Sequence, residues 1–249
     1  MAKPPNDDSA DFERRLRDEK LESLKRLAYG ASHEINNPLA NIASRAQALL
    51  IDEKNPDRRH ELATIYAQAM RGHEMIADLM LFARPPQPVL VACDLDEIAT
   101  AAIAQMAPFA SEQQTLLVYS PPSKLISLQA DANQLTVALV ALVRNALEAV
   151  QRDGQVELAL ACDSADAIMT VRDTGPGIPP EMAEMVFDPF YSGREAGRGL
   201  GFGLTKCWTI AQAHGGEVLV EQNIARGAQL VMKIPLRHSS STQSTSRAS

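Results

Sequence analysis

Residues 32–39 read SHEINNPL and bring three chemically capable side chains into one short stretch. His33 and Asn37 are four residues apart, so they would share one face of a helix, with Glu34 beside them about 100° around the axis. A neutral imidazole nitrogen is a competent nucleophile near neutral pH, and Glu34 could accept the proton from the other ring nitrogen. The stretch therefore predicts a nucleophilic site formed by His33, Glu34 and Asn37, although a lone His–Glu pair facing solvent would carry no chemistry.

Two long helices are expected to position this stretch. From about residue 11 to residue 51, apolar and small residues recur at steps of three and four, as one buried helix face requires. This face comprises Leu24, Ala28, Ala31, Ile35, Leu39, Ile42, Ala46 and Leu49. Residues 52–57 form a turn, and a second amphipathic helix follows to about Ala83. Pro38 cannot donate a backbone hydrogen bond to the carbonyl of Glu34, so we expect the first helix to kink or loosen there.

A hairpin of two such helices cannot bury its apolar faces alone. Pairing of two copies into a four-helix bundle would bury them, so we expect a homodimer. Packing of the same faces against a second domain is the alternative. Residues 84–88, RPPQP, are stiff and cannot continue a helix, and they mark a domain boundary.

Two polar residues beyond this boundary suggest a nucleotide pocket. Asn145 interrupts an apolar helix expected at residues 133–150, with Asp131 as its cap, and a buried amide there needs partners such as hydrated magnesium and phosphate oxygens. Asp173 follows a strand expected at residues 167–172, where a fixed carboxylate can accept a hydrogen bond from an adenine amino group. Gly175 and Gly177 would let the backbone approach the base. A networked asparagine and a plain Asp–Gly turn are the ordinary alternatives.

A glycine-rich segment follows, with cations and aromatic residues before it. Phe187 and Phe190 flank Pro189 and could hinge a mobile lid. Arginines can meet phosphates, and glycines that lead into a helix free backbone N–H groups for a triphosphate. The candidate phosphate-binding residues are Arg194, Arg198, Gly199, Gly201, Gly203 and Leu204. Alone, such a glycine-rich run is a weak signal.

The second region mixes helices with strands. Helices are expected at residues 94–112, 133–150 and 203–213, and strands at 115–120, 155–162, 167–172, 217–222 and 229–235. Helices layered on a mixed sheet give an α+β sandwich. The expected organisation is a disordered N-terminus at 1–10, a helical hairpin at 11–84, a linker at 85–93, a catalytic domain at 94–237 and a disordered tail at 238–249.

Bulk properties exclude several classes. A net charge of −7 argues against nucleic-acid binding, and no apolar run approaches the roughly 20 residues that span a bilayer. The N-terminus is no signal peptide, so a cytoplasmic location is expected, either for a cytoplasmic protein or for the cytoplasmic part of a membrane-bound one. Three cysteines without metal-ligand spacing predict reduced, mostly buried thiols: Cys93, Cys162 and Cys207. The remaining histidines are interpreted as structural, and a zinc site is disfavoured: His60, His73, His214 and His238.

In this order, the motifs closely resemble the transmitter region of bacterial two-component sensor histidine kinases, over roughly residues 20–236. The resemblance implies that His33 attacks the γ-phosphate of ATP, and that Asn37 orients water when the partner is dephosphorylated. It implies ATP and Mg²⁺ as cofactors, with Asn145 at the metal, and a response-regulator receiver domain as phosphoryl acceptor in trans. The sensor input would lie outside this chain. The implied ATP-binding residues are Asn145, Glu148, Asp173, Gly175, Gly177, Ile178, Phe187, Phe190, Arg194, Arg198, Gly199, Gly201, Gly203 and Leu204.

Three positions depart from the family pattern. Arg194 stands where a lysine is more usual, and Phe202 replaces a leucine. Ala141 occupies the place where gyrase-like relatives carry a water-activating glutamate and histidine kinases often carry a second asparagine. This argues against a hydrolytic motor and leaves water or Glu148 to complete the magnesium shell.

The alternatives to a histidine kinase are a nucleotide-sensing scaffold or phosphatase-biased relative with weak autokinase activity, and a gyrase-like hydrolase. Phosphorylation of His33 in cis or in trans stays open.

Overall fold

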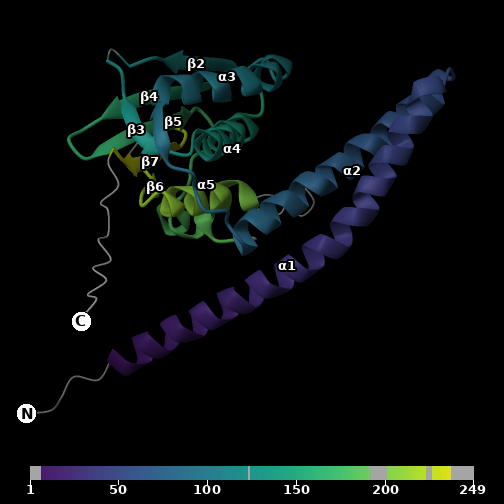
Figure 1. Cartoon of the computed structure of the whole chain (residues 1–249). Helices are drawn as coiled ribbons and strands as arrows, with labels where there is room; N and C mark the ends of the chain where they lie inside the picture. The colour runs from purple at the N-terminus through teal and green to yellow at the C-terminus, as the bar shows by residue number, and fades with distance from the viewer. Residues whose placement is uncertain (1–6, 123, 190, 192–200, 223–225, 237–249) are drawn as a thin grey trace, which may run out of the picture. The chain divides into compact units, whose positions relative to one another are not determined.

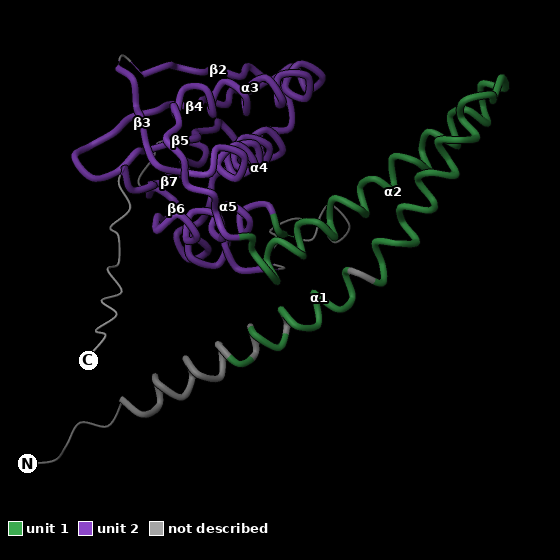
Figure 2. Tube along the Cα trace, viewed as in Figure 1, with its two compact units in different colours: residues 1–86, 194–202 green, residues 87–193, 203–249 purple. Residues whose placement is uncertain are grey.

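The computed structural model describes residues 7–122, 124–189, 191, 201–222 and 226–236, and only the backbone of residues 7–18, 20, 21, 24 and 33 (Figure 1). The chain divides into two compact units (Figure 2). The helical unit comprises residues 1–86 with 194–202, and the sheet unit comprises residues 87–193 with 203–249. None of the helices in the described part of the chain has the length and apolar character that a membrane crossing requires.

The helical unit is built from two helices, α1 (Asp7–Asp52) and α2 (Pro56–Ala83), as the periodicity predicts. Asn55 caps α2, because its side-chain oxygen accepts from the backbone N–H groups of Asp57 and Arg58 at 2.9 and 3.2 Å. Since α1 begins at Asp7, the expectation of disorder is wrong for residues 7–10, which are the first residues of this helix. Residues 1–6 and 237–249 lie outside the described residues.

Pro38 lies inside α1, which remains helical on both sides of it. Figure 1 shows α1 curving along its length, and a kink or loosening just after Asn37 stays a prediction. The buried side chains of the described helical unit between α1 and α2 are mostly small: Ala28, Ser32, Ala43, Ala46, Ala69, Ile76 and Phe82. The hairpin therefore permits a close approach of its helices while covering little large apolar surface.

The sheet unit contains a five-stranded mixed sheet with the order β2-β4-β5-β7-β6. The strands are β2 (Leu116–Ser120), β4 (Gln155–Cys162), β5 (Asp166–Asp173), β6 (Glu217–Val220) and β7 (Gln229–Pro235). β2 runs parallel to β4, and the other pairs are antiparallel. A second sheet pairs β1 (Val91–Asp94) with β3 (Ser127–Ala130). Residues 91–93 are thus part of a sheet and not of a linker.

Three helices accompany the sheet: α3 (Leu95–Glu112), α4 (Ala132–Val150) and α5 (Phe202–Ala213). Two short 3₁₀ turns, η1 (Pro180–Met182) and η2 (Met185–Phe187), follow β5. Burial alternates along β4 and β5, so one face of the sheet points into the core and α4 contacts both strands. This helix-layered mixed sheet confirms the predicted fold class.

The three cysteines, all of them described, form no disulfide and differ in burial. Cys207 is buried and Cys93 is half-buried, as expected, whereas Cys162 is exposed at the end of β4. The expectation of burial is therefore wrong for Cys162, because the alternation of burial along β4 ends at Leu160 and the last two residues of the strand are exposed.

Candidate functional site

The predicted phosphoacceptor turn lies on α1. His33 belongs to the helix, and Glu34 and Asn37 next to it are exposed to solvent. Ser32 points the other way: it is 1% exposed, and its hydroxyl donates to the carbonyl of Ala28 at 2.6 Å. Glu34 and Asn37 are therefore accessible to a second domain or protein.

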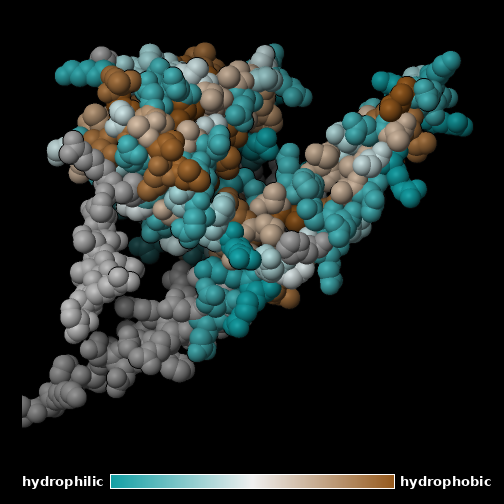
Figure 3. Space-filling view, in the orientation of Figure 1, coloured by the Kyte–Doolittle hydropathy of each residue, from teal (hydrophilic) through white to brown (hydrophobic). Residues whose placement is uncertain are grey.

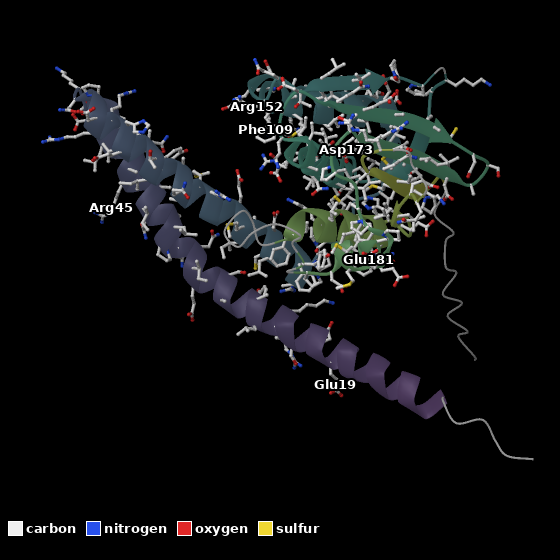
Figure 4. The ribbon with its side chains drawn as sticks, turned by 180° about the vertical axis from the view of Figure 1, so that it is seen from behind. Glu19, Arg45, Phe109, Arg152, Asp173 and Glu181 are labelled. Atoms are coloured by element: carbon white, nitrogen blue, oxygen red, sulfur yellow. The ribbon has the colours of Figure 1, made fainter. Side chains whose placement is uncertain are left out.

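Asp173 ends β5 and is the most deeply buried polar residue of the predicted pocket, at 4% exposure (Figure 4). Its Oδ1 accepts two backbone hydrogen bonds, from Gly175 at 2.7 Å and from Ala228 at 3.2 Å. Burial raises the pKa of this carboxyl above its ordinary value, against the two N–H donors, which act to lower it. Both donors bind the same oxygen, so Oδ2 is the atom that a ligand would approach.

Glycines surround this carboxylate because side chains would not fit. A Cβ on Gly175 would lie 2.9 Å from Asp173 Oδ1, and one on Gly177 would lie 2.8 Å from the carbonyl oxygen of Gly227. Gly227 itself has φ +80°, and its Cβ would overlap the Asp173 carbonyl oxygen at 1.8 Å. Sequence reasoning missed Gly227, since a single glycine before a strand reads as an ordinary turn.

Asn145 and Glu148 are half-buried on α4 and lie three residues apart, on one face of the helix. Asn145 was expected to be buried; its partial exposure leaves the amide accessible to a ligand. Ala141, one turn earlier, is 7% exposed and offers no polar atom. Four neighbouring residues of α4 are buried in the core, and their burial fixes which face of the helix points inward: Leu142, Val143, Ala146 and Leu147.

The Asn145 face fits a hydrated magnesium ion. Among the described residues, no three His, Cys, Asp or Glu side chains gather into a metal-binding group. Mg²⁺ in nucleotide sites keeps several waters and uses one or two protein oxygens beside the phosphates, so a single amide oxygen suffices. Asn145, with Glu148 near it, meets this requirement without a full protein cage.

The predicted lid is described in part. Ile178 and Phe187 are half-buried after β5, Gly201 has φ +75°, and Gly203 and Leu204 lie in the first turn of α5. A Cβ on Gly203 would meet no atom of the described residues within 4 Å. Four predicted site residues lie outside the described residues: Phe190, Arg194, Arg198 and Gly199.

Comparisons with known proteins match both units. A family model described as histidine kinase-, DNA gyrase B- and HSP90-like ATPase matches residues 130–238. A second model, the His Kinase A (phospho-acceptor) domain, matches residues 23–88. The sheet unit is therefore an ATPase domain of this superfamily, and the helical unit is a phosphoacceptor hairpin.

Relatives carry both units in the same order. The sensor histidine kinase ZraS of Salmonella typhi is 31% identical over 222 residues, covering 88% of this chain and 47% of its own. Full-length ShkA in complex with AMPPNP has a similar fold, with a TM-score of 0.75, 23% identity, and coverage of 86% of this chain and 46% of that one. Histidine kinase ThkA in complex with response regulator protein TrrA also has a similar fold. Its TM-score is 0.63 and its identity is 21%, with coverage of 94% of this chain and 68% of that one.

The chain belongs to the two-component sensor histidine kinases and forms their transmitter core. It spans about half the length of the curated relative ZraS. The resemblance inferred from the motifs is confirmed, while the individual site residues stay predictions.

Proposed function

We propose that this chain is an ATP-dependent protein histidine kinase that phosphorylates itself on His33. The phosphoryl group then passes to an aspartate on a separate response-regulator receiver domain. The observation that carries this proposal is Asp173, a buried carboxylate held through one oxygen by two backbone donors and cleared of side chains by glycines. A site of this kind recognises a donor such as the adenine amino group.

In the proposed ATP site, one residue recognises the adenine base and other residues compensate the charge of the phosphates. Asp173 Oδ2 accepts the amino group of adenine, and its burial makes an unmatched base costly. Asn145 holds Mg²⁺ through its amide oxygen, with water or Glu148 beside it. When bound, Mg-ATP supplies the γ-phosphoryl group, and Arg194 and Arg198 neutralise charge that develops on it.

The proposed reaction at His33 is an in-line displacement. A ring nitrogen of His33 forms a bond to the γ-phosphorus while the bond from that phosphorus to the bridging oxygen of ADP breaks. Glu34 takes the proton released by the imidazole ring. Because Glu34 and Asn37 are exposed on α1, both the ATPase domain and a receiver domain can reach this turn.

The proposed joint between the units is short. The guanidinium of Arg84, at the end of α2, lies 5.7 Å from the centre of the Tyr29 ring, one helical turn before His33. Five residues later, the N–H of Val89 donates to Asp131 Oδ2 at 3.0 Å and fixes the chain to the cap of α4. The catalytic domain therefore turns about residues 84–88.

The proposed partners follow from the same surfaces. A second copy of the chain covers the exposed apolar side chains of the hairpin, and a response regulator docks at the accessible turn. ThkA, a kinase of similar fold, binds such a regulator. Since ATP is a cytoplasmic substrate, the reaction takes place in the cytoplasm, with sensor input from outside this chain.

The first test is incubation with Mg-ATP labelled at the γ-phosphate. Acid-labile, base-stable label is expected on the wild-type chain and not on His33→Gln or Asn145→Ala. His60→Gln is the matched control, because His60 is an exposed histidine on α2 outside the site, and its labelling should equal that of the wild type. Label that persists in His33→Gln would refute the nucleophile.

A second candidate function rests on Ala141, which contributes no ligand where related kinases often carry an amide. In that case the chain binds nucleotide but mainly dephosphorylates a regulator, with Asn37 orienting the water. ATP binding without label on His33, together with faster loss of phosphate from the regulator, would favour it. Restoring the amide with Ala141→Asn should then raise autophosphorylation.

A further inference from the structure

We propose that His73 is a positioning residue for the phosphorylation of His33, acting through its hydrogen bond to Asn36. The bond joins α2 to the α1 turn that carries His33 and Asn37. This inference rests on the proposed histidine-kinase function. It adds a residue of α2, outside the stretch of residues 32–39 that carries the phosphoacceptor motif.

The contact is a direct hydrogen bond across the hairpin. His73 Nδ1 lies 2.5 Å from Asn36 Oδ1, between residues 37 positions apart in the sequence, and both side chains are half-buried. A carboxamide oxygen can only accept, so Nδ1 of the ring carries the proton. Asn36 is thereby held in one orientation by a defined tautomer of His73.

Close packing surrounds this bond. Gly72, the neighbour of His73, faces Leu39 so closely that a Cβ would lie 3.0 and 3.1 Å from the two Leu39 methyl carbons. Ala69 and Ile76 on the same side of α2 are 4% and 8% exposed. His73 therefore belongs to the seam between the helices, at a level where they cannot move apart without losing apolar contacts.

The bond lies where α1 needs support. Pro38 cannot donate to the carbonyl of Glu34, so the helix lacks one ladder bond between these two residues. Asn36 sits midway in that interval, three residues after His33 and one before Asn37. A tie to α2 at this point holds in place the weakened turn of α1 that carries His33 and Asn37. Such precision matters, because misplacement of a reacting group by about 1 Å can cost on the order of 100-fold in rate.

Single and double variants test the role. His73→Ala and Asn36→Ala should each lower the autophosphorylation rate constant at saturating ATP about tenfold. The ATP concentration for half-maximal rate should not change, because the nucleotide site is in the sheet unit. The double variant should be no slower than either single variant, since one bond is lost in all three. His73→Gln, whose amide can donate to Asn36, should recover most of the rate, and His60→Ala should match the wild type.

A second readout is independent of kinase activity. Nitrogen chemical shifts of the His73 ring should show the Nδ1-protonated tautomer in the wild type and lose that preference in Asn36→Ala. An Nε2-protonated ring in the wild type, rates equal to wild type in either single variant, or effects that multiply in the double variant would overturn the inference. A wild-type chain that gains no label would overturn the proposed function and the positioning role with it, while the ring spectrum would still report the bond.

Discussion

The two units bury their apolar residues in different ways. The sheet unit encloses large side chains at under 2% exposure: Leu95, Leu128, Leu135, Leu139, Leu142, Leu147, Leu158, Met169, Ile210, Leu230, Met232 and Ile234. The helical unit encloses mainly alanines, and leaves Ile35, Ile42, Leu49 and Ile65 exposed at 44, 45, 62 and 47%. Figure 3 shows apolar side chains at the hairpin surface near its closed end. The sheet unit encloses its own core, whereas the hairpin leaves large apolar side chains exposed.

This difference separates two kinds of stability. A complete core stabilises the sheet unit at any protein concentration. In the proposed dimer, a core shared by two copies would stabilise the hairpin more as protein concentration rises, because association contributes to folding by mass action. Substitutions in the two cores should therefore differ in their dependence on concentration as well as in size.

The largest effect is expected from Ile42→Glu. In the proposed dimer both copies would bury a carboxylate, at about 2 kcal/mol or more each, so the dissociation constant should rise about 1,000-fold. Sedimentation equilibrium measures this change, and ATP binding by the sheet unit should be unaffected. Gln47→Glu adds the same charge at an exposed position of α1 and should leave the dimer intact. A dimer that survives Ile42→Glu would mean that this face is not the shared core.

Leu142→Ala should destabilise the sheet unit by about 2–5 kcal/mol, because it opens a cavity under α4. Urea denaturation should give the same loss at low and at high protein concentration. Val137→Ala, on the same helix but 44% exposed, should cost about 1 kcal/mol or less. A concentration-dependent loss in Leu142→Ala would contradict the self-sufficient core.

Asp173→Asn should weaken ATP binding by about 10- to 100-fold, since an amide NH₂ would face the adenine amino donor. The same change should stabilise the fold at neutral pH. The pKa of Asp173 is raised above 3.8 in the folded chain. The free energy of unfolding of the wild type therefore falls as pH rises from 3.8 to the raised pKa, and it stays at the lower value above that pKa. Thermal denaturation should show the variant more stable at pH 7 and equal to the wild type below pH 3.8. Equal stability at both pH values would contradict the burial cost.

The smallest effect is expected from Asp131→Asn. The asparagine oxygen can still accept from Gln134, but its NH₂ cannot accept from Val89, so stability should fall by about 0.5–1.5 kcal/mol. Burial acts to raise the pKa of Asp131, yet the backbone donors outweigh it and lower the pKa. The wild-type advantage should therefore be present above pH 3.8 and disappear as pH falls through the lowered value. Hydrogen exchange at the Val89 amide should quicken; unchanged exchange would mean that this bond does not hold the joint.

Local features were predictable from the sequence, and distant contacts were not. Strand β4 has the predicted bounds because its alternating residues face the core, and β7 because it is a run of mostly buried apolar residues. Asp131 caps α4, as its position before the helix indicates. β1 and β3 were missed, since four-residue strands carry too little periodicity. The bond from His73 to Asn36 and the approach of Gly227 to Asp173 join residues far apart in the sequence, and no pattern along the chain encodes them.

The proline-rich segment between Arg84 and Val89 acts as a tether of fixed reach. The five Cα–Cα steps from Arg84 to Val89 span at most about 18 Å, and the prolines between these residues keep the segment extended. One end leaves α2 beside Tyr29, a single turn from His33, and the other is fastened to the cap of α4. In the proposed kinase, a tether this short would keep bound ATP at an effective concentration on the order of millimolar around the histidines of the same assembly. In the proposed kinase, phosphorylation within one assembly should therefore proceed at a rate that does not depend on the protein concentration.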